Sequence, residues 1–184
     1  MSLQSFQETL ITAQVDGPTL TAAAAASCLP PAALYTLPAN FYACVGKALL
    51  IEASGRISCA VTTPGTARFG VGFGGTVVAD SLAMSLNIVA KTNVNWWLRM
   101  LLTCRAIGTS ANLMWQGKWE SEAVVGSPVP TAGGCGMFTL PYNSAPAVGA
   151  NFNSTAAQQV DLFFTQTVGT GSLTLHQYAL ISLN

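Results

Sequence analysis

The chain has 184 residues, with seven basic and seven acidic side chains and a formal net charge of zero. Charged residues make up only 8% of it, against roughly a quarter in typical soluble proteins, while hydrophobic residues make up 51%. A chain so poor in charge lacks the basic surface that phosphate neutralisation requires, so it is not expected to bind nucleic acid. Its low charge instead favours association with other protein.

The first 34 residues differ from the rest of the chain. They contain Gly17-Pro18, an alanine run over 22–26 and Pro30-Pro31, with no sustained period of 2 or 3.6. We predict an extended N-terminal arm over 1–34, ordered by contact with a neighbour, ahead of a single β-sandwich domain over 35–184.

The most apolar stretch, 21–42, does not suit a membrane span. Three prolines and Asn40 interrupt it, whereas a spanning helix needs about 20 consecutive apolar residues. The first basic residue is Lys47, so the start of the sequence lacks the basic region of a signal peptide. We therefore expect no membrane partner, and a chain that stays in the cytosol until it assembles.

From Tyr35 onward, apolar and polar residues alternate with period two, which is the pattern of β-strands. Clusters of Gly, Pro, Asn and Ser separate the alternating segments, including Gly108-Thr109-Ser110 between two that suit a hairpin. We predict an all-β antiparallel sandwich, within that class a jelly roll of about eight strands, with a different Greek-key sandwich as the alternative. The expected strands are 47–59, 67–73, 81–89, 96–106, 113–122, 136–140, 160–167 and 173–181.

Five cysteines are spread along the chain, at 28, 44, 59, 104 and 135. Their number is odd, and no two form a C-x-x-C pair, so neither a disulfide framework nor a zinc site is indicated. We predict free thiols, buried as small hydrophobic side chains.

Two patterns suggest catalysis or cofactor binding without their usual context. Residues 70–75 satisfy G-x-G-x-x-G, but the β-branched run that follows them does not open a helix, so we predict a turn or bulge there. His176 is the single histidine and lies in an expected strand, which indicates a structural or interface role. No cofactor or metal site is predicted.

Two carboxylates share one face of an expected strand. Glu120 and Glu122 are two residues apart, a separation that overlaps the range used by inverting glycosidases. A solvated strand face explains them better, with Arg99 and Arg105 of the preceding strand as cross-hairpin partners. We therefore predict that the protein is not an enzyme.

Four tryptophans lie in or near the central hairpin. The alternation places Trp96, Trp115 and Trp119 in the core and Trp97 on the outer face. Trp97 is therefore the best candidate for an interface anchor, and exposed aromatic side chains are also what a sugar-binding site would use.

Several segments resemble small virion proteins of tailed bacteriophages. The resemblance lies in 35–42, with Gly46-Lys47 and 54–58 after it, in the lead-in 14–21 and in the closing strand 173–184. It implies a jelly-roll subunit, commonly a homotrimer, attached to the outside of a phage particle. Decoration proteins of the capsid and tail-associated knobs share such domains, so the fold does not separate the two roles.

The resemblance and the low charge together lead to a capsid decoration (minor capsid) protein as the first hypothesis. It would be made in the host cytoplasm, bind the major capsid protein on the capsid exterior and stabilise the head. The alternative is a tail or baseplate receptor-binding knob that recognises a cell-surface saccharide. The candidate interface residues are Trp97, Arg99 and Arg105 on the outer strand face and Leu10, Val15 and Leu20 in the arm.

Overall fold

The computed structural model describes residues 7–60, 64–126 and 136–183. Strands fill most of this part, and its one helical element is the 3-10 turn η1, Pro31–Ala33. The described residues include no helix long and apolar enough to cross a membrane. The all-β class that the period-two pattern predicted is confirmed.

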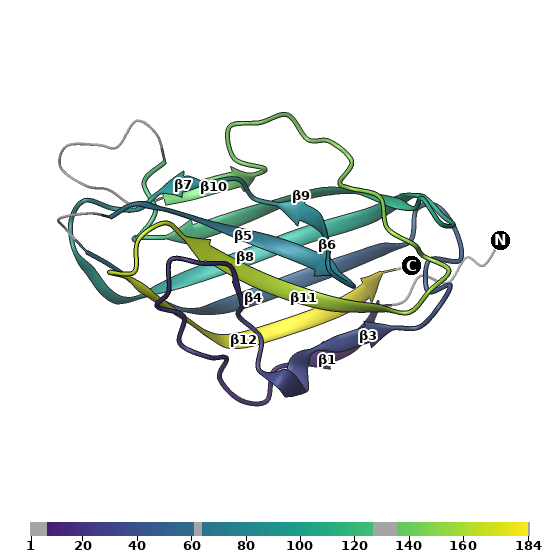
Figure 1. The fold of residues 1–184 in the computed structure, drawn as a ribbon, viewed down its shortest axis with the longest axis horizontal. Coiled ribbons are helices and arrows are strands. Elements are labelled where there is room, and N and C mark those ends of the chain that lie inside the picture. Colours follow the sequence, from purple (N-terminus) through teal and green to yellow (C-terminus); the bar gives the residue numbers. More distant parts are fainter. Residues whose placement is uncertain (1–6, 61–63, 127–135, 184) are drawn as a thin grey trace.

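The strands form two antiparallel sheets that pack face to face as a sandwich (Figure 1). The larger sheet contains, in spatial order, β1 (Gln7–Thr12), β12 (Ser172–Leu183), β4 (Ala48–Cys59), β8 (Lys91–Ala106), β9 (Asn112–Ser121) and β10 (Gly136–Leu140). The smaller sheet contains β2 (Ala26–Ser27), β11 (Gln158–Gln166), β5 (Thr66–Phe73) and β6 (Thr76–Asp80), with β3 (Tyr35–Leu37) also paired to β11 and β7 (Met84–Ser85) also paired to β5.

Side chains that point inward from both sheets form one core. Successive residues of a strand point to opposite faces, so the apolar residues of each alternating segment meet between the sheets. At the centre, the ring of Phe69 lies 4.9–5.2 Å, centroid to centroid, from Trp96, Trp119 and Phe164. Trp96, Trp115 and Trp119 are buried as predicted.

Two pairs of strands are joined across the sandwich in the same way. β4 and β12 are neighbours in the larger sheet, and β5 and β11, which follow and precede them in the chain, are neighbours in the smaller sheet. The chain therefore passes from one sheet to the other between β4 and β5, and again, alongside, between β11 and β12. The antiparallel sandwich is confirmed, whereas the jelly roll remains a prediction.

The strand predicted over 81–89 is wrong. The chain instead turns at Gly74 and Gly75, which have φ of +54° and +92°, and pairs at once as β6. Leu82 then takes a left-handed conformation with φ of 62°, which ends the strand, and only the short β7 follows. The β-branched residues after the glycine turn continue the sheet, and the apolar residues of 81–89 lie mostly outside it.

The first 34 residues run along their own sandwich over the part that the structure describes. β1 pairs with β12 at the edge of the larger sheet, Leu20 bridges to Leu173, and β2 pairs with β11. Cys28, Leu29 and Ala33 enter the core. The segment is extended, as expected, and the contacts described for it are with its own chain. The boundary at residue 34 remains a prediction.

Candidate binding face on the larger sheet

The outer face of the larger sheet carries an exposed tryptophan near its middle. β8 is paired with β4 on one side and β9 on the other, so its backbone is held from both sides. Alternation along β8 turns Trp96 into the core and Trp97 outward, where 38% of Trp97 is exposed. Trp96 is fixed in turn by a hydrogen bond from its Nε1 to the carbonyl oxygen of Arg56, at 3.2 Å. Trp97 therefore stands on a rigid base.

The strand register places polar side chains on both sides of Trp97. Glu120 of β9 and Ser54 of β4 lie directly opposite it, and the same outward row continues to Met137 of β10 and Gln177 of β12. Met137 is 67% exposed. The row thus combines an apolar centre with carboxylate, hydroxyl and amide groups.

Three shallow hollows meet at Trp97. The first, of about 400 Å³, lies toward Glu120 and Met137. The second, of about 160 Å³, lies toward Glu52 and Gln177. The third, of about 280 Å³, lies toward Arg99, Leu101, Gln116 and Lys118. Because Trp97 lines all three hollows, a ligand that covers the indole ring has polar side chains within reach in each of them.

Charged residues beside Trp97 are paired differently from the prediction. The Nε of Arg99 lies 3.3 Å from Oε1 of Glu52 on β4, because the register puts these two residues opposite each other. Across the hairpin, Arg99 faces Lys118 instead of a carboxylate. Glu122 pairs with Lys91 at 3.2 Å. Arg105 forms no ion pair with any residue that the structure describes. The predicted pairing of Arg99 and Arg105 with Glu120 and Glu122 is therefore wrong.

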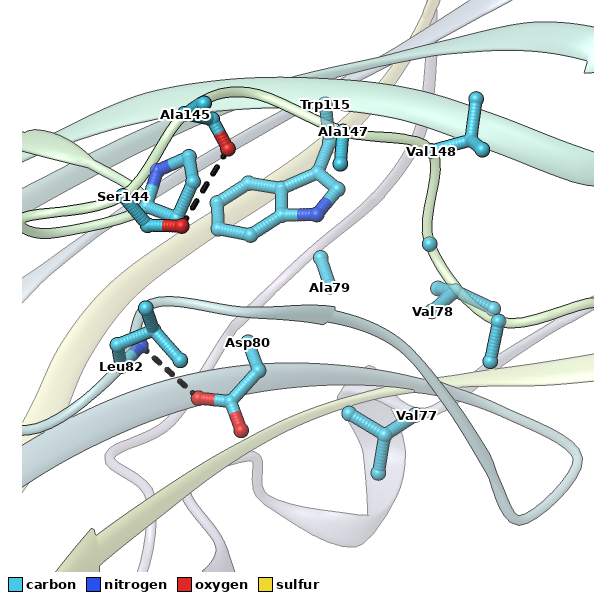
Figure 2. Close-up of a pocket in the computed structure, with 13 residues that line it drawn as sticks. Val77, Val78, Ala79, Asp80, Leu82, Trp115, Ser144, Ala145, Ala147 and Val148 are labelled. Atoms are coloured by element: carbon cyan, nitrogen blue, oxygen red, sulfur yellow. Dashed lines mark hydrogen bonds between the residues drawn. The ribbon is translucent and has the colours of Figure 1, made fainter.

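A fourth hollow, of about 220 Å³, lies over β6 and the segment 141–150 (Figure 2). The indole of Trp115 lies between Ala79 and Asp80 on one side and Ala145 and Ala147 on the other, as Figure 2 shows. Trp115 is only 5% exposed. The carboxylate of Asp80 already has two partners. Nη1 of Arg68 lies 2.9 Å from its Oδ2, and the backbone N–H of Leu82 donates to its Oδ1 at 3.0 Å. The residues that line this hollow are mostly apolar, and its Trp115 is less exposed than Trp97 is on the outer face of the larger sheet.

The residues considered for catalysis are dispersed. His176 is the extra residue of a β-bulge in β12, and its Nδ1 lies 2.8 Å from Oδ1 of Asp16. Residues 70–75 form the end of β5 and its turn into β6, as predicted, with no helix after them. Within the described ranges, no three His, Cys, Asp or Glu side chains come together as metal ligands.

The cysteines that the structure describes are free thiols, as expected. Cys28, Cys59 and Cys104 are buried, and burial raises the pKa of each thiol. Cys44 is exposed, contrary to the prediction, because it lies in the loop between β3 and β4 and not on a strand. Cys135 lies outside the described residues.

The three arm residues proposed as interface contacts have different surroundings. Leu10 and Leu20 are half-buried against the core of their own chain. Val15 is 61% exposed. Of the three, Val15 alone has most of its side chain available to a partner, and the interface role of all three remains a prediction.

Sequence reasoning identified Trp97, Arg99 and Glu120 but missed Ser54, Met137 and Gln177. These three come from β4, β10 and β12, which are far apart in the chain and meet only through long-range pairing. Period-two alternation shows that each points outward, but the register that aligns them with Trp97 depends on partner strands.

No known protein family matches this chain, and no curated protein matches it. Among solved structures, it is similar to the CBM2 module of the evolved Dit protein of Lactobacillus casei BL23 phage J-1. The sequence identity is 9% and the TM-score 0.36, over 99% of this chain and 98% of that one.

Proposed function

We propose that this chain is a non-catalytic virion protein of a tailed phage that binds saccharide on the outer face of its larger sheet. The observation that carries the proposal is the position of Trp97, which is exposed on a central strand where three hollows meet, each with polar side chains in its lining. The phage context is supported by the sequence resemblance. Among the roles considered, the receptor-binding one fits this face best.

The chemistry of the face suits a sugar ring. An indole offers a large flat apolar surface, which packs against the C–H face of a pyranose. Glu120, Ser54 and Gln177 supply acceptors and donors for the hydroxyl groups around the ring. Such a combination of one apolar platform and a few convergent polar groups is typical of small-ligand sites.

We propose that the binding is non-catalytic, because one of the two carboxylates considered for glycoside hydrolysis is engaged in an ion pair. Glu122 is held by Lys91 and follows the end of β9, while Glu120 lies beside Trp97. Incubation of a bound saccharide with the protein is expected to release no new reducing ends. Release that disappears in Glu120→Gln would show a glycosidase instead.

The test is a glycan array followed by calorimetry on the saccharides that bind. Trp97→Ala is expected to weaken binding at least about tenfold, since removing one aromatic platform costs about 1.4 kcal/mol or more. Val77→Ala is the matched control, because Val77 is 43% exposed but lies on the smaller sheet. Equal affinities of Trp97→Ala and the parent protein would contradict the proposal.

Capsid decoration is the second candidate, favoured by exposed apolar side chains on the same face. Leu101 is 43% exposed and Met137 is 67% exposed in a protein with only 8% charged residues. In this role, a homotrimer would seat that face on the major capsid protein and cover these side chains. Electron microscopy of labelled particles distinguishes the two roles, since decoration requires many copies over the head and receptor binding requires a few at the tail.

A further inference from the structure

The charges of this neutral chain are not evenly spread. Apart from Lys91 and Glu122, which neutralise each other as an ion pair, the outward positions of β4, β8 and β9 carry four cations, Arg56, Arg99, Arg105 and Lys118, against two carboxylates, Glu52 and Glu120. The rest of the chain therefore holds three cations and five carboxylates. The face that carries Trp97 has a surplus of two positive charges, and the remainder has a surplus of two negative charges.

Two of these cations face each other directly. Arg99 and Lys118 are register partners on β8 and β9, so their Cβ atoms lie about 4.5–5.5 Å apart. Like charges in this position destabilise a sheet. Glu52 offsets part of the charge through Arg99, but Lys118 forms no ion pair with the described residues. An anion between the two side chains would relieve this repulsion.

This pair lies one row away from the tryptophan. Arg99 and Lys118 line the same hollow of about 280 Å³ as Trp97. Successive outward rows of a strand are about 7 Å apart, a distance that the long Arg and Lys side chains span easily. On the other side, Glu120 lies directly opposite Trp97 and would repel an acid group placed there. Arg99 and Lys118 thus attract an acid group to one side of Trp97, and Glu120 excludes it from the other side, so an acidic ligand is held in one orientation.

We infer that the ligand is an acidic saccharide, whose sugar ring stacks on Trp97 and whose carboxylate binds between Arg99 and Lys118. The inference rests on the proposed saccharide-binding function and names its substrate class. A carboxylate borne by the ring, as in a uronic acid, reaches the neighbouring row while the ring stays on the indole. A phosphodiester lies between sugar units, farther from the stacked ring, and fits the spacing less well.

The test compares three polymers: polygalacturonate, which carries ring carboxylates, poly(glycerol phosphate), which carries phosphodiesters, and neutral dextran. The parent protein is expected to bind polygalacturonate most tightly. Lys118→Gln is expected to weaken this binding about fivefold, the loss of one charge-assisted hydrogen bond, and to leave dextran binding unchanged. Arg68→Gln is the matched control, because it removes a partly exposed cation on β5 of the smaller sheet, outside the proposed site.

The outcomes separate this inference from the function on which it rests. If Trp97→Ala abolishes binding but Lys118→Gln and Arg68→Gln behave alike, saccharide binding stands and the acid-binding site is wrong. Preference for poly(glycerol phosphate) would overturn the carboxylate assignment. Binding to none of the polymers, together with an array that shows no saccharide, would overturn both proposals.

Discussion

Tyr178 and Tyr42 bury their phenolic hydroxyls between the sheets. Both residues are 3% exposed, and neither hydroxyl has a hydrogen-bond partner among the described residues. Burial raises the pKa of both phenols, and the nearby Asp161 carboxylate adds to the effect at Tyr178. Their rings contribute packing, while their hydroxyls contribute a desolvation cost.

This arrangement predicts a specific loss of stability at alkaline pH. An unfolded tyrosine ionises near pH 10, whereas folded Tyr178 stays protonated well above that pH, so the folded state binds the additional proton. The contribution is complete below pH 10 and is lost as the pH rises above it, by at most about 1.4 kcal/mol per pH unit for one group. Urea unfolding between pH 7 and 11.5 should show a smaller decline in Tyr178→Phe than in the parent.

At pH 7, Tyr178→Phe is expected to change the free energy of unfolding by less than about 1 kcal/mol, because the hydroxyl it removes has no partner among the described residues. Tyr42→Phe should reduce the alkaline decline in the same direction. Identical alkaline slopes in the parent and both variants would contradict this reasoning.

The thiols predict a residue-specific pattern of chemical modification. Cys44 is exposed, whereas Cys28 is completely buried and burial raises its pKa well above that of an ordinary thiol. Because the thiolate is the reactive form, iodoacetamide should alkylate Cys44 in the native protein and leave Cys28, Cys59 and Cys104 unmodified until denaturant is added. Peptide mapping by mass spectrometry gives the extent at each site. Native alkylation of Cys28 as fast as that of Cys44 would contradict the buried assignment.

At the scale of whole elements, β1 protects an edge of the larger sheet. It pairs with β12 over Gln7–Thr12, with Leu10 as the extra residue of a bulge. Without it, the backbone N–H and C=O groups of β12 would be open to pairing with another chain. Bulges and short edge strands are common means of limiting such pairing, and β1 has both features.

Deletion of residues 1–13 is therefore expected to lower the melting temperature and to produce aggregates, because it removes β1 and uncovers β12. Differential scanning fluorimetry and size-exclusion chromatography measure the two effects. A synthetic peptide of the same residues, added in excess, should restore part of the stability. A truncated chain that elutes and melts like the parent would show that β1 is dispensable.

The strands that alternation identified best are long or sharply bounded. The predicted 136–140 coincides with β10, and 47–59 differs from β4 by one residue, where polar residues alternate with apolar or small ones from Glu52 to Cys59. β6 was missed because it is only five residues long and follows a glycine turn, and 81–89 was misassigned because its apolar residues do not pair as one strand. Both errors arise from the left-handed backbone conformations at Gly74, Gly75 and Leu82, which the sequence pattern does not show.

At the scale of the whole molecule, the candidate site depends on register more than on composition. Sequence reasoning placed Trp97 outside and Trp96 inside, because neighbouring residues of a strand face opposite ways. The position of Arg99 opposite Lys118 was not predicted, because a shift of the β8–β9 register by two residues would have placed Arg99 opposite Glu120 instead. Local pattern thus gave the direction of each side chain, and long-range pairing gave its neighbours.

The pairing of β1 with β12 also brings the two ends of the described fold together. Gln7 is the register partner of Leu183, at the edge of the sheet, while Trp97 lies on a strand nearer its middle. The first and last strands of the described fold therefore have their outer ends next to each other. A short linker between them would close the backbone into a ring, which new ends at Gly108-Thr109-Ser110 would reopen as a circular permutant. The same adjacency would let a larger host protein accept the sandwich as an insertion within one of its loops.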